Sequence, residues 1–143
     1  MKKILFALIA VLALFTSCIG GESKKRGATA AKEDIVEVLY FHGKQRCITC
    51  NAIEKLTSEV VSSDFADAIK AGKLKMKVID ISTDEGEAIA DEYEVTWSSL
   101  YVNKWKDGKE SRNNLTDLGF SKAKNSPEEF KTQIKFKIAG LLK

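Results

Sequence analysis

Apolar and polar residues form successive blocks along residues 35–143, and each block has the period of a strand or of a helix. Ile35 to Phe41 is almost continuously apolar and rich in β-branched and aromatic residues, which predicts a buried strand. From Ile48 to Val60 apolar residues recur at helical spacing, which predicts a helix with one buried face. Gly72 then provides a common type of helix end. The folded part of the chain therefore begins with a strand followed by a helix.

The next blocks repeat this arrangement. Leu74 to Ile81 predicts a second strand, in which lysines alternate with apolar residues before the run becomes fully apolar. Ser82 and Glu85 have the spacing of a capping box, which predicts that a short helix follows. Leu100 to Trp105 predicts a third strand. Because a strand, a helix and a strand follow one another early in the chain, we expect a right-handed parallel crossover.

The last blocks predict a hairpin and a terminal helix. The Asp-Gly pair at 107–108 is typical of a tight turn, so we expect residues 109–115 to return as an antiparallel strand. A polar loop through Gly119 leads to Ser126 and Pro127, which are a helix N-cap and a favoured first helical residue. The order β-α-β-α-β-β-α predicts an α/β fold of three layers, a mixed central sheet with helices on both faces.

The N-terminal segment has a different pattern. A charged start is followed by an unbroken apolar run from Ile4 to Phe15, which has the length of a signal-peptide core. The small residue before Cys18 resembles the bacterial lipobox, which implies a lipoprotein signal peptide over 1–17 and lipidation of Cys18. Residues 18–34 are rich in glycine, small and charged residues and predict a flexible linker, so the domain spans 35–143. An uncleaved anchor or an ordinary signal peptide is the alternative.

Charge adds little to this picture. The formal net charge is +3, and it falls to +1 when the predicted signal peptide, with Lys2 and Lys3, is removed. The lysines are scattered among acids without a basic stripe, so we expect no nucleic-acid partner.

We expect a monomeric domain in the cell envelope, lipid-anchored to a bacterial membrane and outside the cytoplasm.

The candidate chemistry lies where the first strand gives way to the first helix. The motif there is Arg46-Cys47-Ile48-Thr49-Cys50, and a pair of cysteines at this spacing and in this context indicates a redox dithiol. A thiol at a helix N-terminus faces unpaired N–H groups, which favours its thiolate. We therefore predict that Cys47 attacks and Cys50 resolves the mixed disulfide. The positive charge of Arg46 should lower the pKa of Cys47 further.

Half a zinc site has the same spacing, and a structural disulfide or idle thiols are further alternatives. Beyond the motif the sequence offers only Cys18 and His42 as strong zinc ligands, so we expect neither a resident metal nor a cofactor. His42 could relay protons near the dithiol, or cap a strand end. Asp80 and Glu37 are acids on neighbouring strands, for which solvent-facing or salt-bridged positions are the default.

The element order, with the dithiol at the first strand-to-helix turn, resembles the thioredoxin fold over Ile35 to Lys143. Residues 42–54 and 95–100 are similar to the ArsF-type nitrophenyl-compound nitroreductase subunit family of bacterial lipoproteins. Thioredoxins carry a cis-proline before the third strand, and that position falls on Ser99, whose peptide bond we expect to be trans. The residues expected to line the site are Arg46, Ile48, Thr49, His42, Trp97, Ser98 and Ser99.

These features predict a membrane-tethered thioredoxin-like thiol–disulfide oxidoreductase that exchanges electrons with a redox partner protein. An accessory electron-transfer subunit of a nitroreductase-type system is one alternative. The other alternative is a module that holds a soft metal or metalloid between the two thiolates. In the fold that the chain resembles, the cis-proline discourages metal binding by the dithiol, and this sequence has Ser99 at that position.

Overall fold

The computed structural model describes residues 34–143. The predicted signal peptide, most of the linker and Cys18 lie outside these residues. The elements in chain order are β1 (Ile35–His42), α1 (Ile48–Asp64), α2 (Ala66–Lys70), β2 (Leu74–Asp80), α3 (Asp84–Glu92), β3 (Ser99–Lys106), β4 (Lys109–Ser111), α4 (Thr116–Lys122) and α5 (Pro127–Leu141).

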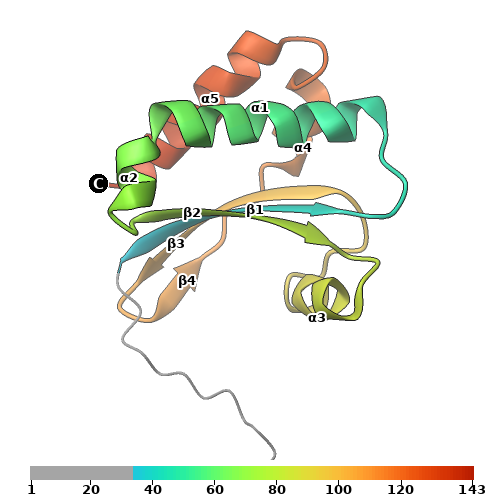
Figure 1. The fold of residues 1–143 in the computed structure, drawn as a ribbon, viewed down its shortest axis with the longest axis horizontal. Coiled ribbons are helices and arrows are strands. Elements are labelled where there is room, and N and C mark those ends of the chain that lie inside the picture. The colour runs from blue at the N-terminus through green and yellow to red at the C-terminus, as the bar shows by residue number, and fades with distance from the viewer. Residues whose placement is uncertain (1–33) are drawn as a thin grey trace, which may run out of the picture.

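One mixed sheet with the strand order β2-β1-β3-β4 organises the described residues. Tyr40 of β1 lies opposite Val78 of the parallel strand β2 and opposite Leu100 of the antiparallel strand β3. Helices α1, α4 and α5 cover one face of the sheet, and α3 covers the other (Figure 1). The predicted three-layer α/β fold with a mixed central sheet is confirmed, and so is the parallel β1-α1-β2 crossover.

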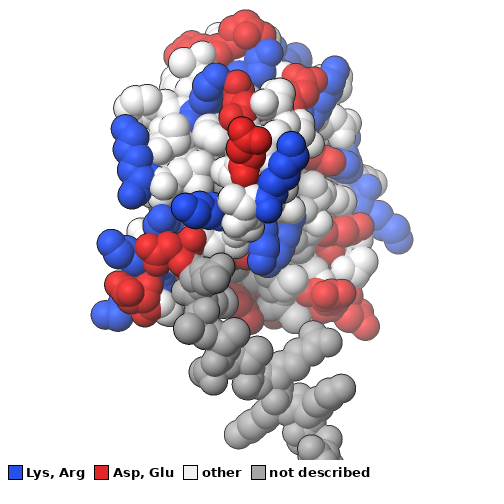
Figure 2. Space-filling view, turned by 60° about the vertical axis from the view of Figure 1, so that its left-hand side comes forward, with Lys and Arg blue, Asp and Glu red and all other residues white. Residues whose placement is uncertain are grey.

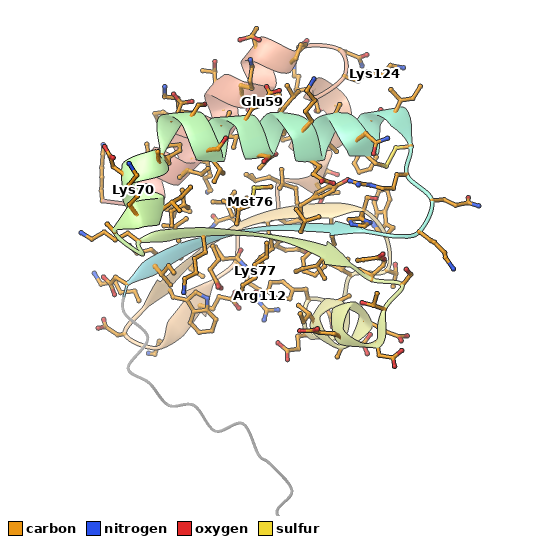
Figure 3. The ribbon with its side chains drawn as sticks, viewed as in Figure 1. Glu59, Lys70, Met76, Lys77, Arg112 and Lys124 are labelled. Carbon is orange, nitrogen blue, oxygen red and sulfur yellow. A yellow bond between two sulfur atoms is a disulfide. The ribbon has the colours of Figure 1, made fainter. Side chains whose placement is uncertain are left out.

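Each face of the sheet has its own apolar core because side chains alternate along a strand. On the α1 side the buried residues of β1 are Val36, Val38 and Tyr40. On the α3 side they are Leu39 and Phe41. The same alternation is visible on β2, where Met76 points into the layer beneath α1 and Lys77 lies on the opposite side of the sheet (Figure 3). The near-continuous apolar run of β1 thus belongs to a strand buried on both faces.

The loop expected around Gly119 is instead the helix α4, so this prediction was wrong. A Cβ atom at Gly119 would come within 2.9 Å of Cδ1 of Ile53, which is fully buried on α1. The missing side chain therefore lets α4 approach α1 closely. Leu118 and Phe120 pack against the same core. A short helix with a central glycine gives no clear periodic signal in the sequence.

Two element ends also differ from the prediction. The returning strand β4 ends at Ser111 rather than at residue 115, although pairing resumes briefly where Tyr101 meets Asn114. The helix α3 begins as expected, but its N-cap is Thr83, whose hydroxyl accepts from the Gly86 N–H at 3.1 Å. Ser82 donates its hydroxyl to the Asp80 carboxylate at 2.6 Å instead, so the predicted capping box does not form.

Lysine and arginine side chains are interspersed with acids on the face seen in Figure 2, so this face carries no continuous basic surface. Two exposed ion pairs, Lys135 with Asp64 and Lys122 with Glu129, have N···O distances of 2.7 and 3.0 Å. Within residues 34–143 no helix has both the length and the apolar character that crossing a membrane requires.

Candidate functional site

The Cys47–Cys50 pair forms a disulfide at the beginning of α1, with the two Cα atoms 5.0 Å apart. Strand β1 ends at His42, and a short loop then carries the chain to Cys47, which is the N-cap of α1. The Cys47 sulfur accepts a hydrogen bond from the Cys50 N–H at 3.0 Å. A sulfur in this position takes the place of a capping oxygen, and the same N–H would stabilise a thiolate there.

The two cysteines differ in access to solvent. Cys47 is exposed, whereas Cys50 is only 6% exposed and lies within the first turn of α1. An incoming thiolate or disulfide can therefore reach Cys47 from solvent, while Cys50 can react only with a group already bound to Cys47. The arrangement is suited to thiol–disulfide exchange in the order that the sequence predicts.

Tyr40 of β1 lies directly beneath the dithiol. Its side chain is fully buried, and its hydroxyl donates to the Cys50 carbonyl at 2.7 Å. Burial raises the pKa of Tyr40, while a hydrogen bond with Ser98 and the positive charge of Arg46 act in the opposite direction. Tyr40 thus remains neutral at physiological pH and anchors the main chain of the resolving cysteine to the central strand. The alternation of β1 predicts that Tyr40 is buried but does not reveal this partner.

Arg46 does not act alone beside Cys47, because it forms an ion pair with Glu54 of α1. The side chains of both residues are about three-quarters buried, with 28% and 27% exposed. The Arg46 guanidinium carbon lies 5.9 Å from the centre of the Tyr40 ring. The prediction that Arg46 adds positive charge next to Cys47 did not include this opposing carboxylate. Glu54 is four residues after Cys50, which places both side chains on one face of the helix.

The chain leading into β3 lies beside the end of β1, at the same end of the sheet as the dithiol. Ser99 lies opposite Phe41 in the register of β3 and β1, and both Ser98 and Ser99 are buried. No cis peptide bond occurs in residues 34–143, so the expected trans bond before Ser99 is confirmed. The Ser99 hydroxyl donates to the Trp97 carbonyl at 3.2 Å.

Two exposed apolar side chains belong to this end of the molecule. Ile48, between the cysteines, is 74% exposed, and Trp97 is 59% exposed. The Trp97 ring stacks on Phe120 of α4, with the ring centres 5.2 Å apart. Helix α4, which the sequence did not predict, thereby supports Trp97. Thr49, the other residue between the cysteines, is half-buried.

The other polar residues considered from the sequence have separate partners. His42 and Gly43 interact through the imidazole Nδ1 and the carbonyl oxygen, 3.0 Å apart. Hydrogen bonds from Ser82 lower the pKa of Asp80, which faces solvent. Glu37 accepts from Lys77 at 3.0 Å and from the indole N–H of Trp105 at 2.7 Å, as expected for a salt-bridged acid. Across residues 34–143 no three His, Cys, Asp or Glu side chains are grouped as a metal site.

No family model and no curated protein matches the chain. Among solved structures it is similar to a thioredoxin from Thermus thermophilus, with a TM-score of 0.44 and 16% identity over 71% of this chain and 72% of that one. It is also similar to a structure described as that of a malarial protein, with a TM-score of 0.42 and 16% identity over 69% of this chain and 96% of that one. Likenesses at this identity concern the fold alone.

Proposed function

We propose that this protein is a membrane-tethered thiol–disulfide oxidoreductase that exchanges electrons with a partner protein. The observation that carries the proposal is the Cys47–Cys50 disulfide at the beginning of α1, with one cysteine at the surface and the other within the helix. A structural disulfide would join distant parts of the chain, whereas this one closes a loop of a few residues and constrains the unfolded chain little. The reactive position of Cys47 is thus better explained by chemistry than by stability.

In the reducing direction the Cys47 thiolate attacks a disulfide of the partner and forms a mixed disulfide, releasing one partner thiol. The Cys50 thiolate then attacks Cys47, which releases the second partner thiol and restores the Cys47–Cys50 bond. Two electrons pass from the dithiol to the partner, and the oxidising direction is the reverse. The hydrogen bond from Tyr40 to the Cys50 carbonyl holds the resolving cysteine in place for the second step.

The proposed anchor is a lipid on Cys18, joined to the domain by residues 18–34. In Figure 1 the chain enters β1 at the end of the sheet opposite to the beginning of α1. A tether attached at that end would leave the dithiol directed away from the membrane, where a partner can approach. The location outside the cytoplasm is proposed from the signal-peptide pattern of residues 1–17 alone.

Insulin reduction by the isolated domain tests the chemistry. We expect turnover with wild type and at least about a thousandfold loss with Cys47→Ser, because the attacking thiolate is absent. Cys50→Ala should accumulate mixed disulfides on Cys47, which mass spectrometry of the native host would identify. Wild-type protein that neither reduces insulin nor forms trapped species with Cys50→Ala would contradict the proposal.

A second candidate is an accessory electron-transfer subunit of a nitroreductase-type system, of the ArsF-type family that residues 42–54 resemble. The exposed Ile48 and Trp97 at the dithiol end fit it, because an electron-transfer subunit, like the oxidoreductase, must dock on the surface of another protein. A nitroreductase trapped on Cys47 would select this candidate. A stoichiometric metal in the reduced protein would select the remaining alternative, a dithiol that holds a soft metal ion.

A further inference from the structure

The ion pair of Arg46 and Glu54 is unusual in its hydrogen bonding. Nη2 of Arg46 and Oε2 of Glu54 face each other in this ion pair, and apart from that contact neither atom, nor the buried Nε of Arg46, has a hydrogen-bond partner among the described residues. The two charges are therefore balanced mainly by each other. A largely buried ion pair is weak evidence for stability, because the cost of removing two charges from water offsets much of their attraction.

Several neighbours of the pair are uncharged, while the titratable His42 lies next to Tyr40, with the two ring centres 6.2 Å apart. Tyr40 of β1 faces Arg46 and stays neutral because burial raises its pKa. Ser98, before β3, adds only a hydroxyl close to Tyr40. Thr57, one turn beyond Glu54 on α1, adds a buried hydroxyl that has no described partner. Glu54 is thus the acid that the structure pairs with the Arg46 charge.

Reduction of the disulfide changes the charge next to this pair. One glutathione thiolate attacks Cys47, the Cys47–Cys50 bond breaks, and Cys50 leaves as a thiolate that takes a proton. A second glutathione thiolate attacks the glutathione sulfur of the mixed disulfide and releases Cys47 as a thiolate. The two glutathione molecules are thereby oxidised to one glutathione disulfide, and the protein disulfide is reduced to the dithiol. The new negative charge belongs to the residue that follows Arg46, and consecutive Cα atoms are only about 3.8 Å apart.

We propose that Glu54 is a positioning residue that holds Arg46 against Tyr40 and withholds part of its positive charge from the Cys47 thiolate. Arg46 by itself would stabilise the thiolate and so make the disulfide a stronger oxidant. Glu54 opposes this effect and makes the dithiol a better reductant. The inference deepens the proposed redox function and rests on it.

Opposite shifts in two variants test the proposal. In a fixed glutathione buffer we expect Glu54→Gln to raise the ratio of dithiol to disulfide about tenfold, a change of about 30 mV. Arg46→Gln should lower that ratio several-fold. The pH dependence of Cys47 alkylation should move in the same sense, with a lower pKa in Glu54→Gln and a higher one in Arg46→Gln. If the ion pair had only a structural role, the ratio of dithiol to disulfide would change in the same direction in both variants, and this result would overturn the proposal.

The double variant tests whether Glu54 acts through Arg46. It removes both charges, so it remains informative if Arg46→Gln alone leaves a destabilising unpaired carboxylate. We expect its ratio to lie close to or below the wild-type ratio. A double variant that keeps the full Glu54→Gln increase would show that the carboxylate acts directly on the thiolate, and would overturn the positioning role. Glu54→Asp should restore at least part of the wild-type ratio.

Glu59 provides the matched control, since it is an exposed acid farther along the same helix (Figure 3). It lies 3.9 Å from Lys55. Glu59→Gln should leave both the dithiol ratio and the Cys47 pKa unchanged, and an equal shift would overturn the assignment to Glu54. Opposite changes of the dithiol ratio in Glu54→Gln and Arg46→Gln, in a protein that does not reduce insulin, would support the inference and reject the oxidoreductase. If the protein reduces insulin but the dithiol ratio changes in the same direction in both variants, only the inference would be rejected.

Discussion

The polar cluster beside β4 and the polar cluster beneath the dithiol are built from similar residue types, but they differ in hydrogen bonding. Beside β4 the fully buried Asn103 donates to Tyr93 and Glu110 at 3.2 and 2.9 Å and accepts from the Asn113 N–H at 3.1 Å. Arg112 completes this cluster, with its guanidinium 3.9 Å from the centre of the Tyr93 ring and its Nε 2.7 Å from Glu110.

Beneath the dithiol, by contrast, buried polar atoms of Arg46, Glu54 and Thr57 have no described hydrogen-bond partner. A satisfied network of buried groups fixes one structure, whereas an incompletely satisfied network costs free energy. The hydrogen bonds of the cluster beside β4 tie Glu110 and the chain around Asn113 to β3, whereas the cluster beneath the dithiol fits our proposal that it balances a charge formed on reduction.

The largest effect on stability is expected at Asn103. Asn103→Ala should lower the free energy of unfolding by about 3 kcal/mol, because it leaves the Asn113 N–H and part of Glu110 unpaired and opens a cavity. Denaturant unfolding measures this loss. The dithiol ratio in glutathione should stay at its wild-type value. If Asn103→Ala changed the dithiol ratio as much as Glu54→Gln does, the two clusters would be coupled and would not have separate roles.

A smaller loss is expected at Tyr40. Tyr40→Phe removes the hydrogen bond to the Cys50 carbonyl and should lower the stability of the disulfide form by about 1 to 2 kcal/mol. Resolution of a mixed disulfide by Cys50 should also slow, because the first turn of α1 is held less firmly. Stopped-flow release of a chromogenic thiol measures that step. Unchanged stability and an unchanged rate would show that the hydroxyl does not anchor the helix.

Thr57 offers a change of opposite sign. Thr57→Val replaces a fully buried hydroxyl that has no described partner by a methyl group of similar shape. We expect a gain of about 1 kcal/mol in the free energy of unfolding, since the penalty of an unsatisfied polar atom is removed. Thr57→Ser, which keeps the hydroxyl and loses the methyl group, is the control and should be destabilising. A destabilised Thr57→Val would mean that the hydroxyl has a partner.

The smallest effect is a pH dependence at the cluster beside β4. Burial and the Glu110 carboxylate raise the pKa of Tyr93 above its ordinary value of 10.0. The folded state therefore holds this proton more tightly than the unfolded chain does. Its contribution is fully present below pH 10 and declines as the pH rises above that value. Because Tyr93 is partly exposed, the slope should be only a few tenths of a kcal/mol per pH unit.

Tyr93→Phe should remove part of this alkaline decline, while the other tyrosines keep theirs. Unfolding curves measured from pH 8 to about 11 provide the comparison. The same slope in wild type and variant would assign the decline to Tyr40 and to other groups, and would leave Tyr93 with a packing role.

The strands, the long helices and the location of the dithiol can all be predicted from the amino-acid sequence. Hydrophobic period encodes these elements because a strand or helix that buries one or both faces must repeat apolar residues at its own spacing. The Ile35–His42 strand and the helix from Pro127 lie where the pattern predicts them. The Cys47–Cys50 spacing could be interpreted as a redox pair because it stands at the junction of a strand and a helix.

The groups that meet around that dithiol are set by how the elements pack together. Glu54 pairs with Arg46, and Tyr40 donates to the Cys50 carbonyl. Both contacts depend on how α1 lies over β1. Helix α4 depends on the close approach that Gly119 allows toward Ile53. Such contacts join residues from different elements, and no local period records them. The sequence therefore locates the reactive sulfurs, while the packing of α1 on the sheet sets the charges that surround them.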